Sequence, residues 1–259
     1  MIRSNLIVFA CIFAATSVAK SADNYEPRVF KNAAEQKLNY QILTPKGYDA
    51  KGTEKYPLVL FLHGAGERGD DNAAQLKHCT KKFLEPENRD KYPCFVMVPQ
   101  CPTGKKWVEV DWSADKHDQP EKPGETMQLV LDTLASLQKE FRVDDRRLYV
   151  SGLSMGGYGT WDLAARYPDR FAAAAPICGG GDEKMSARLS KLPLWVFHGD
   201  QDTAVKPERS RNMIAAIEKA GGKPKYTEFK GVGHNSWDPA YADPALLAWM
   251  FAQRLPSKK

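Results

Sequence analysis

One short stretch constrains the fold of this chain more than any other: Gly152-Leu153-Ser154-Met155-Gly156, a G-x-S-x-G pattern. Residues 146–150 before it are β-rich and residues 160–166 after it favour a helix, so Ser154 falls at a predicted strand-to-helix turn. Glycines two positions before and after the serine avoid a collision with the neighbouring strand and helix, and the turn itself is strained. The pattern therefore predicts a nucleophile elbow, with the Ser154 hydroxyl held in the open.

A serine hydroxyl is a weak nucleophile and needs an adjacent base that an acid orients. Downstream of Ser154, a buried-strand run at 194–199 leads into an acidic turn with Asp202, and a glycine-rich loop at 230–237 carries His234. The order Ser, Asp, His is the one used by the α/β-hydrolase fold, which also needs an oxyanion loop after an earlier strand. The apolar run at 57–62, followed by His63-Gly64-Ala65-Gly66, supplies that loop.

With these motifs, the chain resembles α/β-hydrolase esterases of the group called "predicted peptidase" or prolyl oligopeptidase family, close to the polyhydroxybutyrate-depolymerase-like and feruloyl-esterase-like branches. The resemblance implies an α/β fold with a mostly parallel, doubly wound sheet flanked by helices. It spans most of the chain from about Lys37 onward. The segments that carry it are LFLHGAGERG (60–69), VPQCP (98–102), LYVSGLSMGGYGTW (148–161), HGDQD (198–202) and HNSWDPAY (234–241).

The resemblance assigns Ser154 as nucleophile, His234 as general base and Asp202 as the acid that orients the base. Asp200 is the alternative acid, because it precedes Asp202 by two residues. Two further histidines, His63 and His198, also precede a glycine at a strand end, but in the family the first supports the oxyanion loop and the second precedes the acid.

An oxyanion hole needs two backbone N–H donors aimed at the developing negative charge. Met155, the residue after the nucleophile, supplies one, and Ala65 the other, with Gly66 as the alternative. The neighbouring Glu67 and Arg68 are expected to form a structural ion pair that shapes this loop.

The rest of the chain alternates between predicted strands and helices, which favours right-handed crossovers in one sheet. Residues 38–43 alternate apolar and polar, as in a half-exposed edge strand, after a polar, extended lead-in at 22–37. A helix is expected at 73–84, capped by Asp70 or Asp71 and closed by Pro86. The remaining predictions are strands at 94–98, 171–177 and 225–229 and helices at 125–141, 212–220 and 244–254.

A long stretch without periodicity, residues 103–124, follows the predicted strand at 94–98 and carries Trp107 and Trp112. Ligands bind at the carboxyl ends of strands in open α/β sheets, so we expect both tryptophans to contact substrate. The alternative is that they fill the base of the loop. Trp237, three residues after His234, is likewise either a substrate contact or a brace for the loop.

Residues 1–19 have the pattern of a secretory signal peptide: a basic start at Arg3, a ten-residue apolar run, and small residues before Ala19. The run is shorter than the roughly 20 residues that span a bilayer. We therefore expect a secreted or periplasmic protein without a stable membrane anchor, and one catalytic domain at 20–259. In an oxidising compartment, Cys79 and Cys94 are expected to form a disulfide, with buried free thiols as the alternative.

Charge and composition narrow the function further. Removing Arg3 leaves 36 of the 37 basic residues against 32 acidic ones, interleaved, which gives little support to nucleic-acid binding. The sequence has no ligand spacing typical of a metal site, and we expect no cofactor. The predicted function is an exported carboxylesterase acting on small-molecule or polysaccharide esters; the alternatives are a serine peptidase and an inactive hydrolase-fold binding protein.

Overall fold

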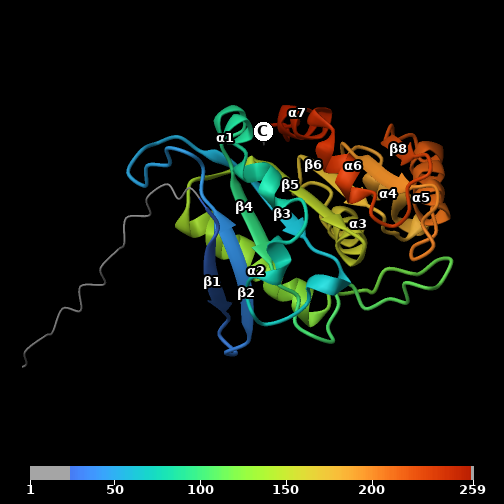
Figure 1. The fold of residues 1–259 in the computed structure, drawn as a ribbon, viewed down its shortest axis with the longest axis horizontal. Coiled ribbons are helices and arrows are strands. Elements are labelled where there is room, and N and C mark those ends of the chain that lie inside the picture. The colour runs from blue at the N-terminus through green and yellow to red at the C-terminus, as the bar shows by residue number, and fades with distance from the viewer. Residues whose placement is uncertain (1–23, 258–259) are drawn as a thin grey trace, which may run out of the picture.

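A single eight-stranded sheet forms the centre of the computed structural model, which describes residues 24–257 (Figure 1). The predicted leader at 1–19 lies outside the described residues. The strand order is β1-β2-β4-β3-β5-β6-β7-β8. The pairs β1–β2 and β2–β4 are antiparallel, and all pairs from β4 to β8 are parallel. This confirms the predicted fold class. The strands are β1 (Glu26–Lys31), β2 (Lys37–Leu43), β3 (Tyr56–Leu62), β4 (Phe95–Pro99), β5 (Val143–Leu153), β6 (Ala173–Ile177), β7 (Trp195–Gly199) and β8 (Lys225–Phe229).

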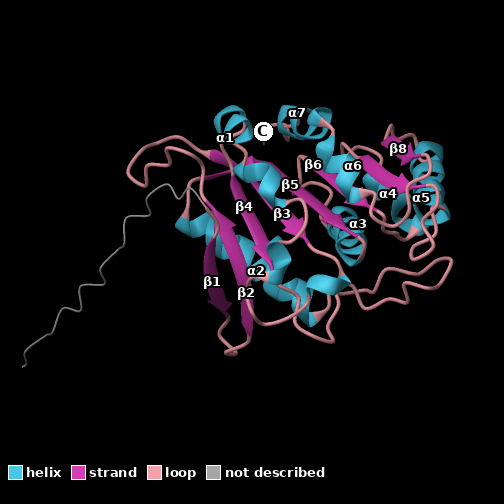
Figure 2. Ribbon diagram, viewed as in Figure 1, coloured by secondary structure: helices cyan, strands magenta, loops and turns pink. Residues whose placement is uncertain are grey.

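Helices cover both faces of the sheet, as the ribbon in Figure 2 shows. The central strands are buried on both sides: in β3, Leu58 and Leu60 face one apolar cluster with α2, α3 and α5, and Val59 and Phe61 face a second cluster with α6 and α7. This two-sided burial explains why the strand reads as a continuous apolar run. The helices are α1 (Pro86–Lys91), α2 (Glu125–Glu140), α3 (Met155–Arg166), α4 (Ser186–Leu189), α5 (Glu208–Lys219), α6 (Trp237–Ala242) and α7 (Pro244–Ala252).

The edge of the sheet differs from the prediction. The polar lead-in contains strand β1, so β2 lies one position inside the edge and pairs with both β1 and β4. Sequence periodicity missed β1 because its side chains are all half-buried or exposed. An edge strand tolerates such charged residues, and Arg28 of β1 pairs with Glu140 of α2 at 2.6 Å.

The helix expected at 73–84 is wrong. The segment contains two short 3₁₀ turns, η2 (Ala74–Leu76) and η3 (Thr80–Leu84), separated by Cys79 with a left-handed φ of 63°. Asp71 does cap locally, accepting the backbone N–H groups of Ala73 and Ala74. Pro86 begins α1 and closes no helix, because its fixed φ suits the first helical position.

The alanine-rich strand at 171–177 is confirmed as β6, between β5 and β7. Its alanines favour helix in isolation, but both faces of this strand are covered and all five of its residues are buried. Tertiary context therefore overrides local propensity here. The carboxyl ends of β5, β6, β7 and β8 meet at one edge of the sheet, where the site described next is built.

Candidate active site

Ser154 occupies a strained turn between β5 and α3. Its backbone has φ 53° and ψ −118°, a left-handed conformation that a non-glycine residue rarely adopts. A Cβ added to Gly152 would lie 2.5 Å from the Gly156 carbonyl oxygen, and one added to Gly156 would lie 1.9 Å from the Leu62 oxygen. Only glycine fits at both positions, so the turn can hold Ser154 at the edge of the sheet.

The three residues predicted as nucleophile, base and acid lie in one hydrogen-bonded chain. His234 Nε2 is 2.9 Å from Ser154 Oγ, and His234 Nδ1 is 2.7 Å from Asp202 Oδ2. An ionised carboxylate only accepts hydrogen bonds, so Nδ1 carries the imidazole proton and Nε2 is free to accept from the serine hydroxyl. The arrangement can remove a proton from Ser154.

Two loops bring Asp202 and His234 together. Gly199 at the end of β7 approaches the His234 loop so closely that a Cβ would lie 2.2 Å from the Val232 oxygen. Gln201 donates its backbone N–H to that same oxygen at 3.0 Å. Asp200, the alternative acid, accepts the Gly231 N–H at 2.7 Å, so its carboxylate links the turn after β7 to the loop that carries His234. Asp202 is the carboxylate that contacts His234.

The carboxylate of Asp202 is buried and held by four donors. Oδ1 accepts the backbone N–H groups of Ala204 and Val205, each at 2.9 Å, and Oδ2 faces His234 and also His198 Nε2 at 3.2 Å. Burial alone raises the pKa of Asp202, but the hydrogen bonds from His198, His234 and Val205 outweigh it and hold this pKa well below its usual range. Asp202 is therefore ionised and fixed in orientation.

His63 supports the loop predicted to form the oxyanion hole. Its Nε2 accepts the Cys101 N–H at 2.9 Å, and its Nδ1 donates to the Gly64 oxygen at 2.6 Å. Burial lowers the pKa of His63 to about 4, so the ring is neutral and has one donor and one acceptor. One ring nitrogen is thus bound to the loop itself and the other to Cys101, which follows β4.

The predicted oxyanion donors adjoin the nucleophile. A Cβ on Gly64 would lie 3.6 Å from Ser154 Cβ, which places the backbone just before Ala65 against the serine. Ala65 begins a 3₁₀ turn, η1 (Ala65–Glu67). Met155 begins α3, and the first N–H groups of a helix have no acceptor within it. Helix geometry therefore leaves the Met155 N–H open for a negatively charged oxygen.

Glu67 and Arg68 do not form the expected ion pair with each other. Glu67 is buried and lies 3.4 Å from His78 Nε2, whereas Arg68 Nε donates to the Ala65 oxygen at 2.8 Å. The two adjacent side chains point in different directions, so the charges lie apart. Glu67 contacts His78, and Arg68 contacts the backbone of the loop.

Trp237 lies between two histidines. Its ring centroid is 5.5 Å from that of His234 and 5.3 Å from that of His78. The indole is thus packed on the ring of the predicted base, which matches the bracing alternative for Trp237. His78, which has no motif around it in the sequence, is the third ring of this edge-to-face cluster.

The two tryptophans of the 103–124 segment differ. Trp107 is completely buried and donates to the His63 oxygen at 3.0 Å, so its predicted contact with substrate is wrong; it fills the base of the loop. Trp112 is half-buried, and its backbone oxygen accepts from Tyr158 Oη at 3.3 Å. Tyr158 lies one turn after Ser154, so Trp112 remains the candidate for a substrate contact.

Buried Arg209 of α5 holds the 103–124 segment in place. Its guanidinium donates to the Ala114 oxygen at 2.7 Å, to His117 Nδ1 at 2.6 Å and to the Gly181 oxygen at 3.1 Å. The segment is therefore fixed against the loop that follows β6. This fixed segment forms one wall beside the carboxyl ends of the strands.

The predicted Cys79–Cys94 disulfide is wrong. Both thiols are free: Cys94 immediately precedes β4 and is buried, whereas Cys79 lies between η2 and η3 with a left-handed φ of 63°. A separation of fifteen residues in the sequence does not fix the distance between two sulfurs, because the chain between them here is a 3₁₀ turn, η3, and a short helix, α1, and not the predicted helix. The cysteines within residues 24–257 are all free: Cys79, Cys94, Cys101 and Cys178.

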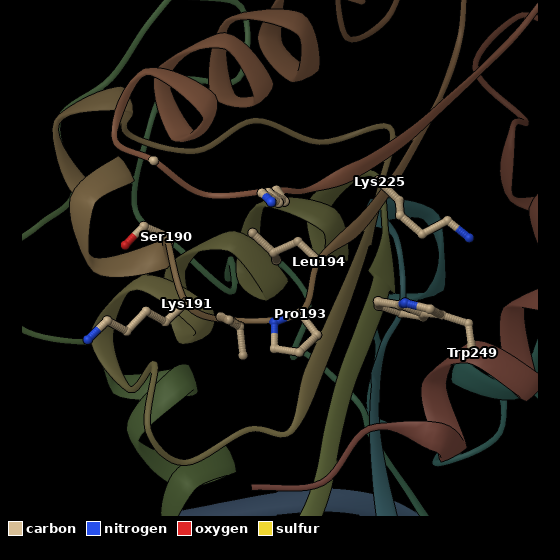
Figure 3. A pocket seen from close by; sticks show the side chains of 9 residues that line it. Ser190, Lys191, Pro193, Leu194, Lys225 and Trp249 are labelled. Atoms are coloured by element: carbon tan, nitrogen blue, oxygen red, sulfur yellow. The ribbon is translucent and has the colours of Figure 1, made fainter. Parts of the chain in front are cut away.

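A hollow of about 360 Å³ lies away from these residues (Figure 3). It lies between the segment before β7, which includes Pro193 and Leu194, and the start of β8 at Lys225, with Trp249 of α7 beside it. These are the beginnings of parallel strands, whereas Ser154 follows a strand end. The hollow is thus separate from the hydrogen-bonded chain.

Comparison with known proteins gives a consistent result. A family model described as "Putative esterase" matches residues 31–242. Poly(3-hydroxyalkanoate) depolymerase C of Paucimonas lemoignei is 30% identical over 242 residues, which cover 92% of this chain and 55% of that protein. A bifunctional acetylxylan esterase/xylanase of Neocallimastix patriciarum is 28% identical over 159 residues, 61% of this chain and 21% of that protein. The chain thus spans about half, or less, of the length of these relatives.

Among solved structures, one described as a thermostable esterase superimposes with a TM-score of 0.82 and 36% sequence identity. The match covers 90% of this chain and 64% of that one. Within the part of the chain that the structure describes, no helix is both long and apolar enough to cross a membrane.

Proposed function

This chain belongs to the Esterase family, and from that membership we propose that it hydrolyses carboxylic esters with Ser154 as nucleophile. The observation that carries the proposal is the chain of hydrogen bonds from Ser154 through His234 to Asp202, at 2.9 and 2.7 Å. A strained serine at a strand-to-helix turn, with a base in hydrogen-bond distance, is the geometry that acyl transfer requires.

In the acylation step, Ser154 Oγ attacks the ester carbonyl carbon while His234 Nε2 takes the hydroxyl proton. Asp202, held ionised by its donors, stabilises the imidazolium that forms. The tetrahedral intermediate collapses when the alcohol leaves with the proton from His234. The product of this half-reaction is an acyl-enzyme on Ser154.

The negative oxygen of the intermediate needs donors that are in place beforehand. We assign the backbone N–H of Met155 and that of Ala65, with Gly66 as the alternative to Ala65. One such donor is worth about 3 kcal/mol of transition-state stabilisation. In deacylation, a water molecule gives a proton to His234 and attacks the acyl carbon. The bond to Ser154 Oγ then breaks, His234 returns the proton to Oγ, and the carboxylic acid leaves.

The proposed substrates are esters with a bulky, partly solvated alcohol, such as acylated polysaccharides, met outside the cytoplasm. The proposed contact is half-buried Trp112 of the fixed 103–124 segment, whose backbone oxygen accepts from Tyr158, a residue one helical turn after Ser154. The acetylxylan esterase named for the Neocallimastix relative supports this substrate class. The leader pattern at 1–19 supports export.

A fluorophosphonate probe tests the assignment, because it labels a serine only where the hydroxyl is activated. We expect labelling of the wild type and none of Ser154→Ala. Ser113→Ala is the matched control: it removes an exposed serine whose hydroxyl donates to Asp111, and its labelling should equal that of the wild type. Labelling that persists in Ser154→Ala would contradict the proposal.

A further inference from the structure

Cys178 comes directly after β6, the strand next to β5 that leads into the nucleophile, and its thiol has no part in the proposed reaction. The residue follows β6, is completely buried and has a left-handed φ of 40°. Its Sγ, a carboxylate oxygen of Asp202 and a ring nitrogen of His234 all lie within 4.8 Å of one another. A sulfur, an oxygen and a nitrogen ligand from three separate loops therefore converge at one point.

A second observation marks the same place. The hydroxyl of Ser236 lies beside the Cys178 thiol, is completely buried and has no oxygen or nitrogen partner within residues 24–257. Buried polar groups normally have such a partner. The surroundings of Cys178 thus contain a buried hydroxyl that takes no part in the hydrogen-bonded chain of Ser154, His234 and Asp202.

The types of these side chains select one class of ligand. Zinc and similar soft divalent cations bind cysteine sulfur, histidine nitrogen and carboxylate oxygen at about 2.0 to 2.3 Å, usually in a tetrahedron with one position open to water. Magnesium and calcium prefer six or more oxygen ligands, which this cluster does not offer. Entry is possible from the side of His234, whose side chain is 28% exposed.

We propose that Cys178, Asp202 and His234 form a binding site for a soft divalent cation of the zinc class, and that its occupation stops ester hydrolysis. The binding stands on the cluster alone, whereas the inhibition rests on the proposed function.

The chemistry of binding explains the inhibition. A cation bound at Nδ1 takes the place of the proton that His234 shares with Asp202, and this proton moves to Nε2. A cysteine binds a metal as the thiolate, so the Cys178 thiol gives up its proton to solvent when the cation binds. One cation enters and one proton leaves. Nε2 then carries a hydrogen and has no lone pair for the proton of Ser154.

The test compares zinc binding and zinc inhibition in three proteins: wild type, Cys178→Ala and the matched control Cys79→Ser. Cys79 is the more exposed of the described thiols and lies outside the cluster. Hydrolysis of p-nitrophenyl acetate is measured with zinc chloride in increasing concentration, and binding by calorimetry with zinc chloride alone. Magnesium chloride serves as the control for ionic strength and charge.

Wild type and Cys79→Ser should bind one zinc ion and lose activity, and EDTA should restore it. Each protein is compared with its own zinc-free rate, and the zinc concentration for half-inhibition of Cys178→Ala should rise by about tenfold or more because one of three ligands is gone. Magnesium should have no effect. Equal zinc sensitivity in Cys178→Ala and wild type would overturn the proposal.

Two additions keep the outcomes separate. Cys178→Ser, which has a side chain of similar size, replaces the alanine variant should that variant unfold at a lower temperature than wild type. Calorimetry on Ser154→Ala measures zinc binding without turnover. One bound zinc in Ser154→Ala and its loss in the Ser154→Ala/Cys178→Ala double variant would support the site even if the wild type hydrolysed no ester. Absence of zinc binding in Ser154→Ala and wild type would overturn it.

Discussion

His198 Nε2 lies 3.2 Å from Asp202 Oδ2, the same oxygen that faces His234 Nδ1 at 2.7 Å. The carboxylate is thus held between two imidazoles, one completely buried and one at the surface of the site. His198 Nδ1 lies 2.7 Å from Ser210 Oγ, and its Nε2 lies 2.9 Å from the Val205 oxygen. Since a carbonyl only accepts, Nε2 carries the hydrogen; it donates to the Val205 oxygen and shares this N–H with Asp202 Oδ2 at the longer distance.

His198→Phe should lower kcat with little change in KM, because it removes a donor to the ionised acid and leaves the substrate surface intact. A hydrogen bond to a charged group is worth about 1.5 to 3 kcal/mol, which corresponds to roughly a 10- to 100-fold loss. His198→Gln, which retains an N–H donor, should retain more activity. Steady-state kinetics on p-nitrophenyl butyrate measure this, and a phenylalanine variant with wild-type kcat would contradict it.

The two neighbouring aspartates should differ sharply. Asp202→Asn should reduce kcat by about 10⁴-fold, because an amide favours the wrong tautomer of His234. Asp200→Asn keeps an oxygen that accepts the Gly231 N–H, so its kcat should stay near that of the wild type. The pair is compared at equal folded concentration, checked by circular dichroism. A larger loss in Asp200→Asn would assign the acid to Asp200.

Gly156→Ala should fail to fold or lose about 3 kcal/mol or more, since its Cβ would lie 1.9 Å from the Leu62 carbonyl oxygen, a backbone atom of the central sheet. A Cβ on Gly66 would meet nothing within 4 Å, so Gly66→Ala should unfold at the wild-type temperature. Thermal unfolding followed by circular dichroism measures both. Equal stability of the two variants would show that the turn relaxes around an added methyl group.

Acid should destabilise the protein through His63. Its pKa is about 4 when folded and about 6.5 when unfolded, so between these pH values only the unfolded chain binds the proton. This contribution to stability is complete above pH 6.5 and decreases, by up to about 3 kcal/mol, as the pH falls toward 4. Urea unfolding at pH 4.5, 5.5 and 7 should show a smaller decrease for His63→Gln than for wild type; an unchanged decrease would refute the role of His63.

Esters should be cleaved faster than amides of the same acyl group by at least about 100-fold in kcat/KM, because expelling an amine needs closer alignment than the short loops at this site provide. The panel is p-nitrophenyl acetate and butyrate, methyl ferulate and acetylated xylan beside p-nitroanilides and unstructured peptides, with Ser154→Ala as the blank. Comparable rates on peptides would favour the serine peptidase alternative.

Local sequence signals were sufficient where a residue type is imposed by backbone geometry. The glycines around Ser154 predicted the elbow. Any other residue at Gly152 or Gly156 would place its Cβ within 3 Å of two backbone carbonyl oxygens. The continuous apolar runs at 57–62 and 94–98 predicted buried strands of a parallel sheet, which are β3 and β4. Edge strand β1 left no such signal, because its solvent-facing side chains show no apolar period.

The contacts between the site residues and their neighbours could not be predicted from local sequence signals. His198 stands four positions before Asp202 in the sequence, which is a usable signal, but only the turn after β7 shows that both imidazoles meet one carboxylate oxygen. His78 and Cys178 have no motif. Their contacts come from chain segments far apart, and periodicity carries no information about these.

The sequence by itself determined the order of the strands from β2 to β8, the fold class and the identity of Ser154, Asp202 and His234 as candidates, since these depend on short motifs and hydrophobic period. Tertiary structure alone decided which way each side chain faces at the ends of neighbouring strands. It buried Trp107, separated Cys79 from Cys94 and brought Cys178 to the acid and base. The reason is physical: a contact between loops depends on the register of the strands that carry them, and register is a property of the whole sheet.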